Sequence, residues 1–431
     1  MVKEKLDYRL VDIEIKKIIQ ELSKKIEAYY IFPEKGEEIS QFLLNKLEKS
    51  KFYGIIDPVK LARIITNDLV DVSNDLHFYL EYNPSMAQTL KEEEKEDKNG
   101  IDDDYLDFKL GLKFEQYKNY YIIKAERLPG NIGYIKLDDF PPSEFAGETI
   151  IGAFQFLANS NAFIFDIRNN GGGYPSMVSL IISHLIEPTS KLLTSIYDRK
   201  SNKHYQNWTV PYIPGRRFPN NPVYVLTSRR TASGAEEFAY VLKMLERGTI
   251  VGETTRGAAN PVDIFPILNK FVIWLPIGTP TNPISNDNWE GKGVSPNYEV
   301  PQEKALEKAH MLAFDEILKN LDDKEIQRMV QFELEYCKAM YNPINVDLEI
   351  LKDWEGKYDR YLIIIIDNIA YLERANLRHE IITKDNNIFF TNETTKFWFE
   401  EEDNEKILVI ERRDFPTPIK LIRVKNNSNL Q

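Results

Sequence analysis

The spacing of apolar residues changes along the chain. Up to about residue 90, apolar residues recur at helical intervals in three segments, and the third opens with Asp57 at the N-cap and Pro58 at the first helical position. An alternating stretch, HFYLEY, then begins at His77 and is typical of a strand. We therefore predict an N-terminal helical bundle over residues 1–90.

Short apolar runs alternate with amphipathic helices over residues 119–300. The runs NAFIFDIR and PVYVLTS are typical of buried strands, and each is followed by a turn and a helical pattern. Such alternation predicts a mostly parallel or mixed sheet covered by helices. The predicted fold class is α/β (α+β), with this sheet as the core.

Three further segments complete the predicted organisation. Residues 91–118 form a charge-rich connector that we interpret as a solvated loop, because its DDD stretch lacks the ligand pattern of a calcium loop. Residues 301–343 predict a helical linker of two helices ending at Pro343. Residues 344–431 contain short strands divided by Asn and Asp turns, which predicts a small all-β domain.

Composition excludes several classes of function. The net charge is −12 over 431 residues, which argues against a nucleic-acid surface and against docking to an anionic membrane. The single cysteine, Cys337, permits neither an intrachain disulfide nor a cysteine metal cluster. The five histidines lack the spacing of metal-binding motifs, so we expect neither a metal nor another cofactor.

The ends and the apolar runs bear on localisation. The N-terminus is charged and lacks the apolar segment of a signal peptide, and YLIIIIDNIAYL is too short and too polar to span a membrane. We expect a cytoplasmic protein, although a chain from which a signal peptide had been removed would look the same.

Ser233 stands between a predicted strand and a helix in the stretch NPVYVLTSRRTASGAEEFAYVLK. Serine is a preferred N-cap, and Glu236 three residues later would complete a capping box. The same position suits a nucleophile, since strand ends in α/β folds carry ligand sites and the helix from Gly234 presents unpaired N–H groups.

Two other stretches contain candidate chemistry. FIFDIRNNGGGYP places three glycines between a strand and a helix, which exposes backbone amides to an anion. It lacks the spacing of nucleotide-binding motifs, so an oxyanion hole shared with the Gly234 amide fits better than a phosphate site. The loop NPISNDNWEGKGVSPNYEV contains Trp289 and the carboxylate Glu290 among Asn, Gly and Pro residues.

Four ordered motifs together, FIFDIRNNGGG, VYVLTSRRTASGAEEFAYVLK, TIVGETTRGAANP and NWEGKGVSPNYEV, resemble the S41 family of serine peptidases. That family includes the carboxy-terminal processing (tail-specific) proteases, the tricorn core and the modules of the interphotoreceptor retinoid-binding protein. The resemblance covers about residues 60–300 and is greatest to the tricorn-like and retinoid-binding-protein-like branches. It implies a ClpP/crotonase-like mixed sheet, and residues 78–118 leave no room for the PDZ domain of the processing proteases.

The resemblance also implies the site residues. Ser233 matches the nucleophile, while Gly257 and Ala258 occupy the stretch in which processing proteases carry a lysine base. The tricorn-like branch uses a histidine and a glutamate instead, which match His77 and Glu290. Leu76 stands where that branch has a serine before the histidine, so the fourth member of the group is not assigned.

The implied mechanism is acyl transfer. His77 takes the Ser233 proton as the hydroxyl attacks a peptide carbonyl, Glu290 orients the imidazole, and the amides of Gly234 and Gly172 hold the oxyanion. The expected partner is a peptide or a protein C-terminal tail. The alternatives are an esterase and a non-catalytic module that binds retinoids or fatty acids; His204 is the rival base, and the sequence does not determine the oligomeric state.

Overall fold

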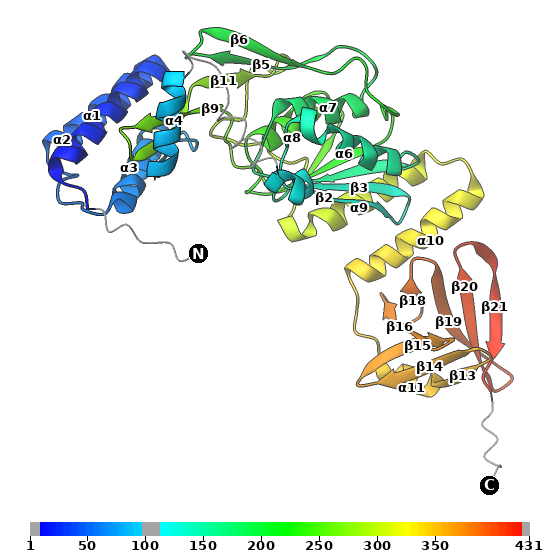
Figure 1. The fold of residues 1–431 in the computed structure, drawn as a ribbon. Helices are drawn as coiled ribbons and strands as arrows, with labels where there is room; N and C mark the ends of the chain where they lie inside the picture. The colour runs from blue at the N-terminus through cyan, green and yellow to red at the C-terminus, as the bar shows by residue number, and fades with distance from the viewer. Residues whose placement is uncertain (1–8, 97–112, 425–431) are drawn as a thin grey trace. The chain divides into compact units, whose positions relative to one another are not determined.

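The computed structural model describes residues 9–96 and 113–424 (Figure 1). The chain divides into two compact units. The first comprises residues 1–125, 134–158 and 163–306, and the second comprises residues 126–133, 159–162 and 307–431. Within the described ranges, no helix combines the length and hydrophobicity needed to cross a membrane.

The N-terminal part of the first unit contains the predicted helices. Asp57 caps its helix as expected, because its carboxylate accepts hydrogen bonds from the N–H groups of Val59 and Lys60. The apolar faces of the first three helices pack against a three-stranded antiparallel sheet of order β1-β10-β9. The elements are α1 (Asp12–Tyr29), α2 (Pro33–Glu48), α3 (Pro58–Ser73), α4 (Pro84–Glu96), β1 (Tyr79–Tyr82), β9 (Val262–Ile267) and β10 (Phe271–Pro276).

The prediction of a solvated loop from residue 91 was wrong for residues 91–96, which belong to α4. This stretch continues a helix that opens at Pro84, a favoured first helical residue, and residues 113–117 of the predicted connector are helical as well. Residues 97–112 of the predicted connector lie outside the described residues.

A six-stranded sheet of order β12-β8-β7-β4-β3-β2 forms the core of the first unit. Strands β4, β7, β8 and β12 pair in parallel, and the helices α6, α7 and α8 pack beside the sheet around a cluster of buried apolar residues (Figure 1). This confirms the predicted mixed α/β fold. The strands are β2 (Ile122–Leu128), β3 (Ile132–Leu137), β4 (Ala162–Asp166), β7 (Val223–Thr227), β8 (Thr249–Gly252) and β12 (Tyr298–Glu299); the helices are α6 (Ser143–Phe156), α7 (Pro175–Leu185) and α8 (Gly234–Met244).

A third sheet, of order β11-β5-β6, was missed by the sequence analysis. It consists of the hairpin β5 (Leu192–Asp198) and β6 (Lys203–Trp208) with β11 (Gly278–Thr281). His204, the rival base of the sequence analysis, lies on β6, and its ring packs on Tyr197 with centroids 5.1 Å apart. Five of the six β6 residues are exposed, so the strand lacks the alternation by which a half-buried strand is recognised.

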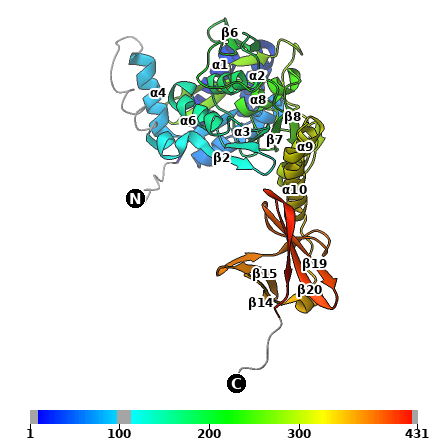
Figure 2. The same ribbon diagram turned by 90° about the vertical axis from the view of Figure 1, so that its right-hand side faces the viewer.

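The second unit contains the predicted helices and the all-β region (Figure 2). Its strands form a four-stranded sheet, β13-β14-β15-β16, and a five-stranded sheet, β17-β18-β19-β20-β21, both antiparallel. Apolar residues of both sheets share one core. The elements are α9 (Ala305–Lys319), α10 (Lys324–Tyr341), α11 (Leu348–Trp354), β13 (Gly356–Tyr358), β14 (Tyr361–Ile366), β15 (Ile369–Arg374), β16 (Leu377–Glu380), β17 (Ile382–Thr383), β18 (Phe389–Asn392), β19 (Thr395–Glu402), β20 (Glu405–Arg412) and β21 (Phe415–Ile422).

Candidate active site

Three connecting segments leave the six-stranded sheet at the carboxyl ends of parallel strands. The glycine segment follows β4, Ser233 follows β7, and a segment that we call the strap, residues 255–260, follows β8. Because β4, β7 and β8 are parallel neighbours, their carboxyl ends lie at one edge of the sheet. The fold thus brings together motifs separated by nearly 90 residues of sequence.

Ser233 has a strained backbone. Its φ is 53° and its ψ is −124°, a combination that a residue with a Cβ rarely adopts. A sharp strand-to-helix turn of this kind exposes the hydroxyl of a nucleophilic serine. The residue occupies the N-cap of α8, but within the described chain its hydroxyl makes no capping hydrogen bond. Ser233 therefore stands at the predicted N-cap, but a hydrogen bond from its hydroxyl to the helix is not among the described contacts.

The carboxylate half of the predicted capping box does form, and it extends further than expected. Glu236 accepts the Ser233 N–H at 2.9 Å, and it also accepts the N–H groups of Gly257 and Ala258 at 2.6 and 2.9 Å and the Thr255 hydroxyl at 2.5 Å. The side chain is fully buried, and this burial raises the pKa of Glu236. Glu236 therefore joins the backbone of Ser233 to the strap.

The glycine segment lies directly against Ser233. A Cβ on Gly172 would stand 2.7 Å from the Ser233 Cβ, and a Cβ on Gly234 would stand 2.7 Å from the Gly173 carbonyl oxygen. Both positions thus require glycine for this close approach. The Gly172 N–H, however, donates to the Asn170 side-chain oxygen at 2.9 Å. In this structure the amide predicted for the oxyanion hole is thus already engaged.

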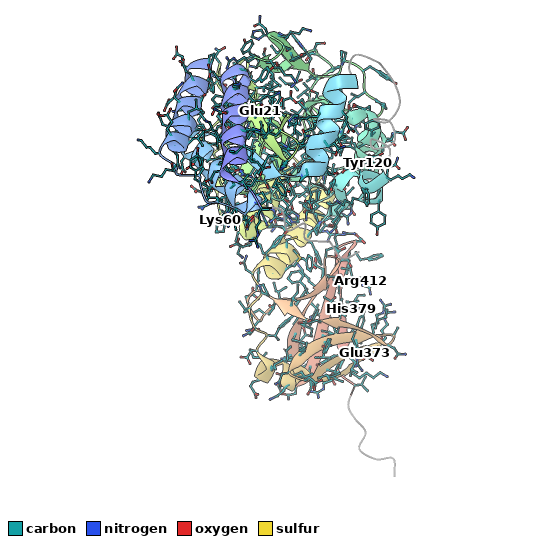
Figure 3. The ribbon with its side chains drawn as sticks, turned by 60° about the vertical axis from the view of Figure 1, so that its left-hand side comes forward. Glu21, Lys60, Tyr120, Glu373, His379 and Arg412 are labelled. Atoms are coloured by element: carbon teal, nitrogen blue, oxygen red, sulfur yellow. The ribbon has the colours of Figure 1, made fainter. Side chains whose placement is uncertain are left out.

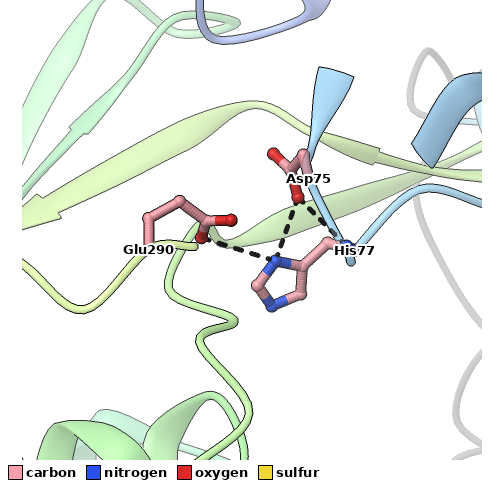
Figure 4. A group of neighbouring side chains, drawn as sticks. All are labelled: Asp75, His77 and Glu290. Carbon is pink, nitrogen blue, oxygen red and sulfur yellow. Dashed lines mark hydrogen bonds and ion pairs between the residues drawn. The ribbon is translucent and has the colours of Figure 1, made fainter. Parts of the chain in front are cut away.

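His77 stands between α3 and β1, at the edge of the three-stranded sheet. Its Nδ1 lies 3.3 Å from Asp75 Oδ1 and 4.0 Å from Glu290 Oε2, while Nε2 points away from both carboxylates (Figure 4). Both ring nitrogens are buried, and neither has a hydrogen-bond partner among the described residues. The 3.3 Å contact is thus an ion-pair distance that lacks hydrogen-bond alignment.

Asp75 is a site residue that the sequence analysis did not assign. Its Oδ1 accepts the His77 backbone N–H at 3.0 Å, and its Oδ2 accepts Asn260 Nδ2 at 2.9 Å and the Tyr30 hydroxyl at 3.4 Å. The residue is 2% exposed. The burial of Tyr30 and its closeness to Asp75 raise the pKa of the Tyr30 hydroxyl, which keeps this donor protonated. These bonds hold the Asp75 carboxylate in place beside the imidazole.

Glu290 is fixed by the strap on the other side of the imidazole. Its Oε2 accepts the N–H groups of Ala259 and Asn260 at 2.6 and 3.0 Å, while the buried Oε1 has no partner in the described part of the chain. Burial, and then the charge of Asp75, raise the pKa of the Glu290 carboxyl. The neighbouring Trp289 donates its indole N–H to the Ala258 carbonyl at 3.1 Å.

The three predicted side chains are therefore connected through the strap. Ser233 donates its N–H to the Ala258 carbonyl at 3.1 Å, and the next two strap amides bind Glu290 beside His77. His77 and Glu290 are neighbours, as the resemblance implied. A hydrogen bond between Ser233 and His77 is absent from the described contacts, since Nε2 has no partner.

Asp75, His77 and Glu290 offer three ligand atoms within 4.8 Å of one another, a spacing that a metal ion can use. Most of the carboxylate oxygens, however, already accept hydrogen bonds, and only Glu290 Oε1 has none within the described structure. The group therefore fits the orientation of an imidazole better than the binding of a cation.

The other histidines of the first unit have different surroundings. His184 is buried, its Nδ1 lies 3.1 Å from the Arg216 carbonyl oxygen, and burial lowers the pKa of its ring. His204 lies exposed on β6. In the second unit, His310 contacts the Pro129 carbonyl oxygen, and burial lowers its pKa to about 4. Of these, His77 alone stands beside two carboxylates in the described contacts.

Comparisons with known proteins agree with this organisation. Residues 131–300 match the description "Peptidase family S41", and residues 10–104 match "N-terminal domain of Peptidase_S41 in eukaryotic IRBP". The chain therefore belongs to the S41 family of serine peptidases.

Individual relatives are distant. The chain is 26% identical over 192 residues to carboxyl-terminal-processing peptidase 2 of Arabidopsis thaliana, covering 41% of this chain and 34% of that protein. It is 25% identical over 246 residues to the tricorn protease of Thermoplasma volcanium, covering 54% and 20%. A solved structure of a putative peptidase from Parabacteroides merdae covers 69% of this chain and 96% of that one, with 18% identity and a TM-score of 0.48. The chain thus spans about a third or less of the length of these curated relatives.

Proposed function

We propose that the protein is a serine peptidase in which Ser233 is the nucleophile and His77 is its general base. The observation that carries this proposal is the strap, which binds the Ser233 backbone through Ala258 and binds Glu290, the neighbour of His77, through the next two amides. Family membership supports the reaction class, and the strained turn at Ser233 supports the choice of nucleophile.

In this proposal His77 uses its two nitrogens for different tasks. Nδ1, which faces the carboxylates, carries the proton, and Nε2, which faces away from them, accepts the proton of Ser233 as the hydroxyl attacks the scissile carbonyl. Asp75 and Glu290 then balance the charge of the imidazolium. Nε2 later returns the proton to the leaving amine, and water hydrolyses the acyl-enzyme by the same steps.

The oxyanion of the tetrahedral intermediate forms beside Ser233. We assign one donor to the Gly234 N–H at the start of α8, where the positive end of the helix dipole favours negative charge. The Gly172 N–H would serve as the second donor after it releases Asn170. One such donor typically contributes about 3 kcal/mol to the stability of the transition state.

As substrates we propose peptides or C-terminal tails of proteins, on the basis of the relatives named as carboxyl-terminal-processing peptidases. The test is labelling with a serine-directed fluorophosphonate, which needs no knowledge of the substrate. We expect wild type to be labelled, Ser233→Ala not to be labelled, and His77→Ala to be labelled at least about 100-fold more slowly. Wild-type labelling rates in His77→Ala would remove His77 from the mechanism.

The N-terminal match to the domain of eukaryotic IRBP favours a second candidate, a non-catalytic module that binds a hydrophobic ligand. The same labelling experiment separates the two functions. A wild-type protein that is not labelled, yet binds retinol or a fatty acid saturably, would be the binding module rather than the peptidase.

A further inference from the structure

The second unit contains a pocket at one end of its two sheets. The pocket has a volume of about 370 Å³ and lies between strands of the four-stranded and the five-stranded sheet. The first sheet contributes Tyr361, Arg374 and His379, and the second contributes Thr395 and Arg412. Openings between sheets and at the mouths of barrels are common places for small ligands, and this volume lies within the usual range.

The charged side chains among the residues that line this pocket are positive. Arg374 and Arg412 both line it, and none of its described lining residues is an aspartate or a glutamate. Neither arginine has an ion-pair partner in the described chain. Other cations of the same sheets do have one: Arg378 pairs with Glu373 at 2.6 Å and Lys396 with Glu411 at 3.1 Å.

Strand alternation explains why Glu373 does not neutralise the pocket. Arg374 and Leu372 line it from β15, whereas Glu373 lies between them in sequence and so points to the opposite face, where it pairs with Arg378. Arg412 and His379, which line the pocket, and Glu373 are labelled in Figure 3. The pocket lining therefore contains Arg374 and Arg412 but not the carboxylate of Glu373.

Tyr361 fixes both guanidinium groups. Arg412 donates from Nη2 to the Tyr361 hydroxyl at 2.7 Å, and the Arg374 guanidinium carbon lies 5.4 Å from the centroid of the same ring. Arg412 Nε is buried and has no hydrogen-bond partner among the described residues. The partner that matches a guanidinium without an ion pair is an oxyanion.

We propose that this pocket binds a small molecule that carries an oxyanion, either a carboxylate or a phosphate. Arginine presents its donors in a planar fork that fits the oxygens of both groups. Leu372 and Leu377 also line the pocket, so its volume can hold an apolar portion of the ligand next to the charged group. The proposal does not depend on Ser233 or on peptidase activity.

The test is calorimetric titration of the full chain with inorganic phosphate and, separately, with hexanoate, both at constant ionic strength. We expect saturable binding of at least one probe, weakened about tenfold or more by Arg374→Gln. The matched control is Arg378→Gln, which changes the same residue type on the adjacent strand outside the pocket and should bind as wild type does.

Each result decides the proposal. Binding of phosphate alone or of hexanoate alone supports it and identifies the oxyanion, and competition between the two supports one shared site. Arg412→Lys is a second variant, checked by circular dichroism because Arg412 also holds Tyr361. Absence of saturable binding of both probes, or binding that is unchanged in folded Arg374→Gln, overturns the proposal.

Discussion

The Nδ1 atom of His77 lies closer to Asp75, at 3.3 Å, than to Glu290, at 4.0 Å. Asp75 also accepts the backbone N–H of His77 itself, so the carboxylate and the imidazole are fixed relative to each other by a local turn. Glu290 approaches the ring from a distant loop, and its Oε2 accepts hydrogen bonds from two amides of the strap. In the proposed mechanism, Asp75 is therefore better placed than Glu290 to orient the imidazole of His77.

This difference predicts unequal effects of two isosteric substitutions. Asp75→Asn should slow fluorophosphonate labelling of Ser233 by about 10²–10⁴-fold, the range expected when the partner of a catalytic histidine loses its charge. Glu290→Gln should slow it less. The measurement is the second-order rate of labelling for each variant, and a larger loss in Glu290→Gln would reverse the assignment.

The glycine segment permits a matched pair of variants. Gly172→Ala should lower the labelling rate by about 100-fold, because its φ is +127° and the new Cβ would meet Ser233 at 2.7 Å and displace it. Gly171→Ala is the control, since a Cβ there has open space and no positive φ. Equal rates for the two variants would show that the contact with Ser233 does not matter.

Glu236 should be a structural determinant of the site. Glu236→Gln replaces a carboxylate that accepts four hydrogen bonds with a group that has one acceptor oxygen, so we expect a loss of about 2–3 kcal/mol in the free energy of unfolding. Thermal melting checks this, with the exposed Glu246→Gln as the control. Identical melting temperatures for the two variants would contradict the role of Glu236.

The strained backbone of Ser233 predicts that replacing this residue with glycine stabilises the fold more than replacing it with alanine. Ser233→Gly removes the Cβ that makes φ 53° and ψ −124° costly, whereas Ser233→Ala keeps it. The free energy of unfolding of the glycine variant should therefore be about 1 kcal/mol higher than that of the alanine variant. This figure already allows for the greater conformational entropy of glycine in the unfolded chain. A glycine variant that melts below the alanine variant would argue against strain.

A pH dependence follows from Glu237, which is buried on α8 and accepts hydrogen bonds from Thr194 and Asn207. Burial raises the pKa of its carboxyl above the usual 4.5, so between 4.5 and the raised value the folded chain binds more protons than the unfolded chain. Glu237 thus makes the fold less stable as pH rises through this window.

Glu237→Gln removes this titration. The melting temperature of the variant relative to wild type should rise as the pH increases from about 4.5 towards neutrality. Calorimetric scans at several pH values measure the difference. A difference that is constant with pH, or that falls, would show that Glu237 titrates normally.

The sequence predicted the fold well where burial leaves a periodic pattern. The strands before the glycine segment and before Ser233 are apolar and fully buried, and both were predicted. The exposed hairpin around His204 was missed because residues that face solvent on both sides show no alternation. Local pattern therefore identifies the core and fails at its periphery.

The candidate site was predicted less completely than the fold. The resemblance pointed to His77 and Glu290, which lie next to each other in the structure. Asp75 stands only two residues before His77, but its contacts with Asn260, 185 residues away, and with Tyr30 could not be read from the sequence. The positive φ of Ser233 was equally hidden, since serine gives no sign of an unusual backbone whereas glycine would have suggested one.

The strap has a consequence for the newly synthesised chain. Synthesis proceeds from the N-terminus, so His77 and Ser233 leave the ribosome before the strap and before Glu290. Until residue 290 has emerged and the strap has bound both Ser233 and Glu290, these two residues and His77 belong to segments that are not yet packed together. The candidate site can therefore be complete only after residue 290 has been synthesised.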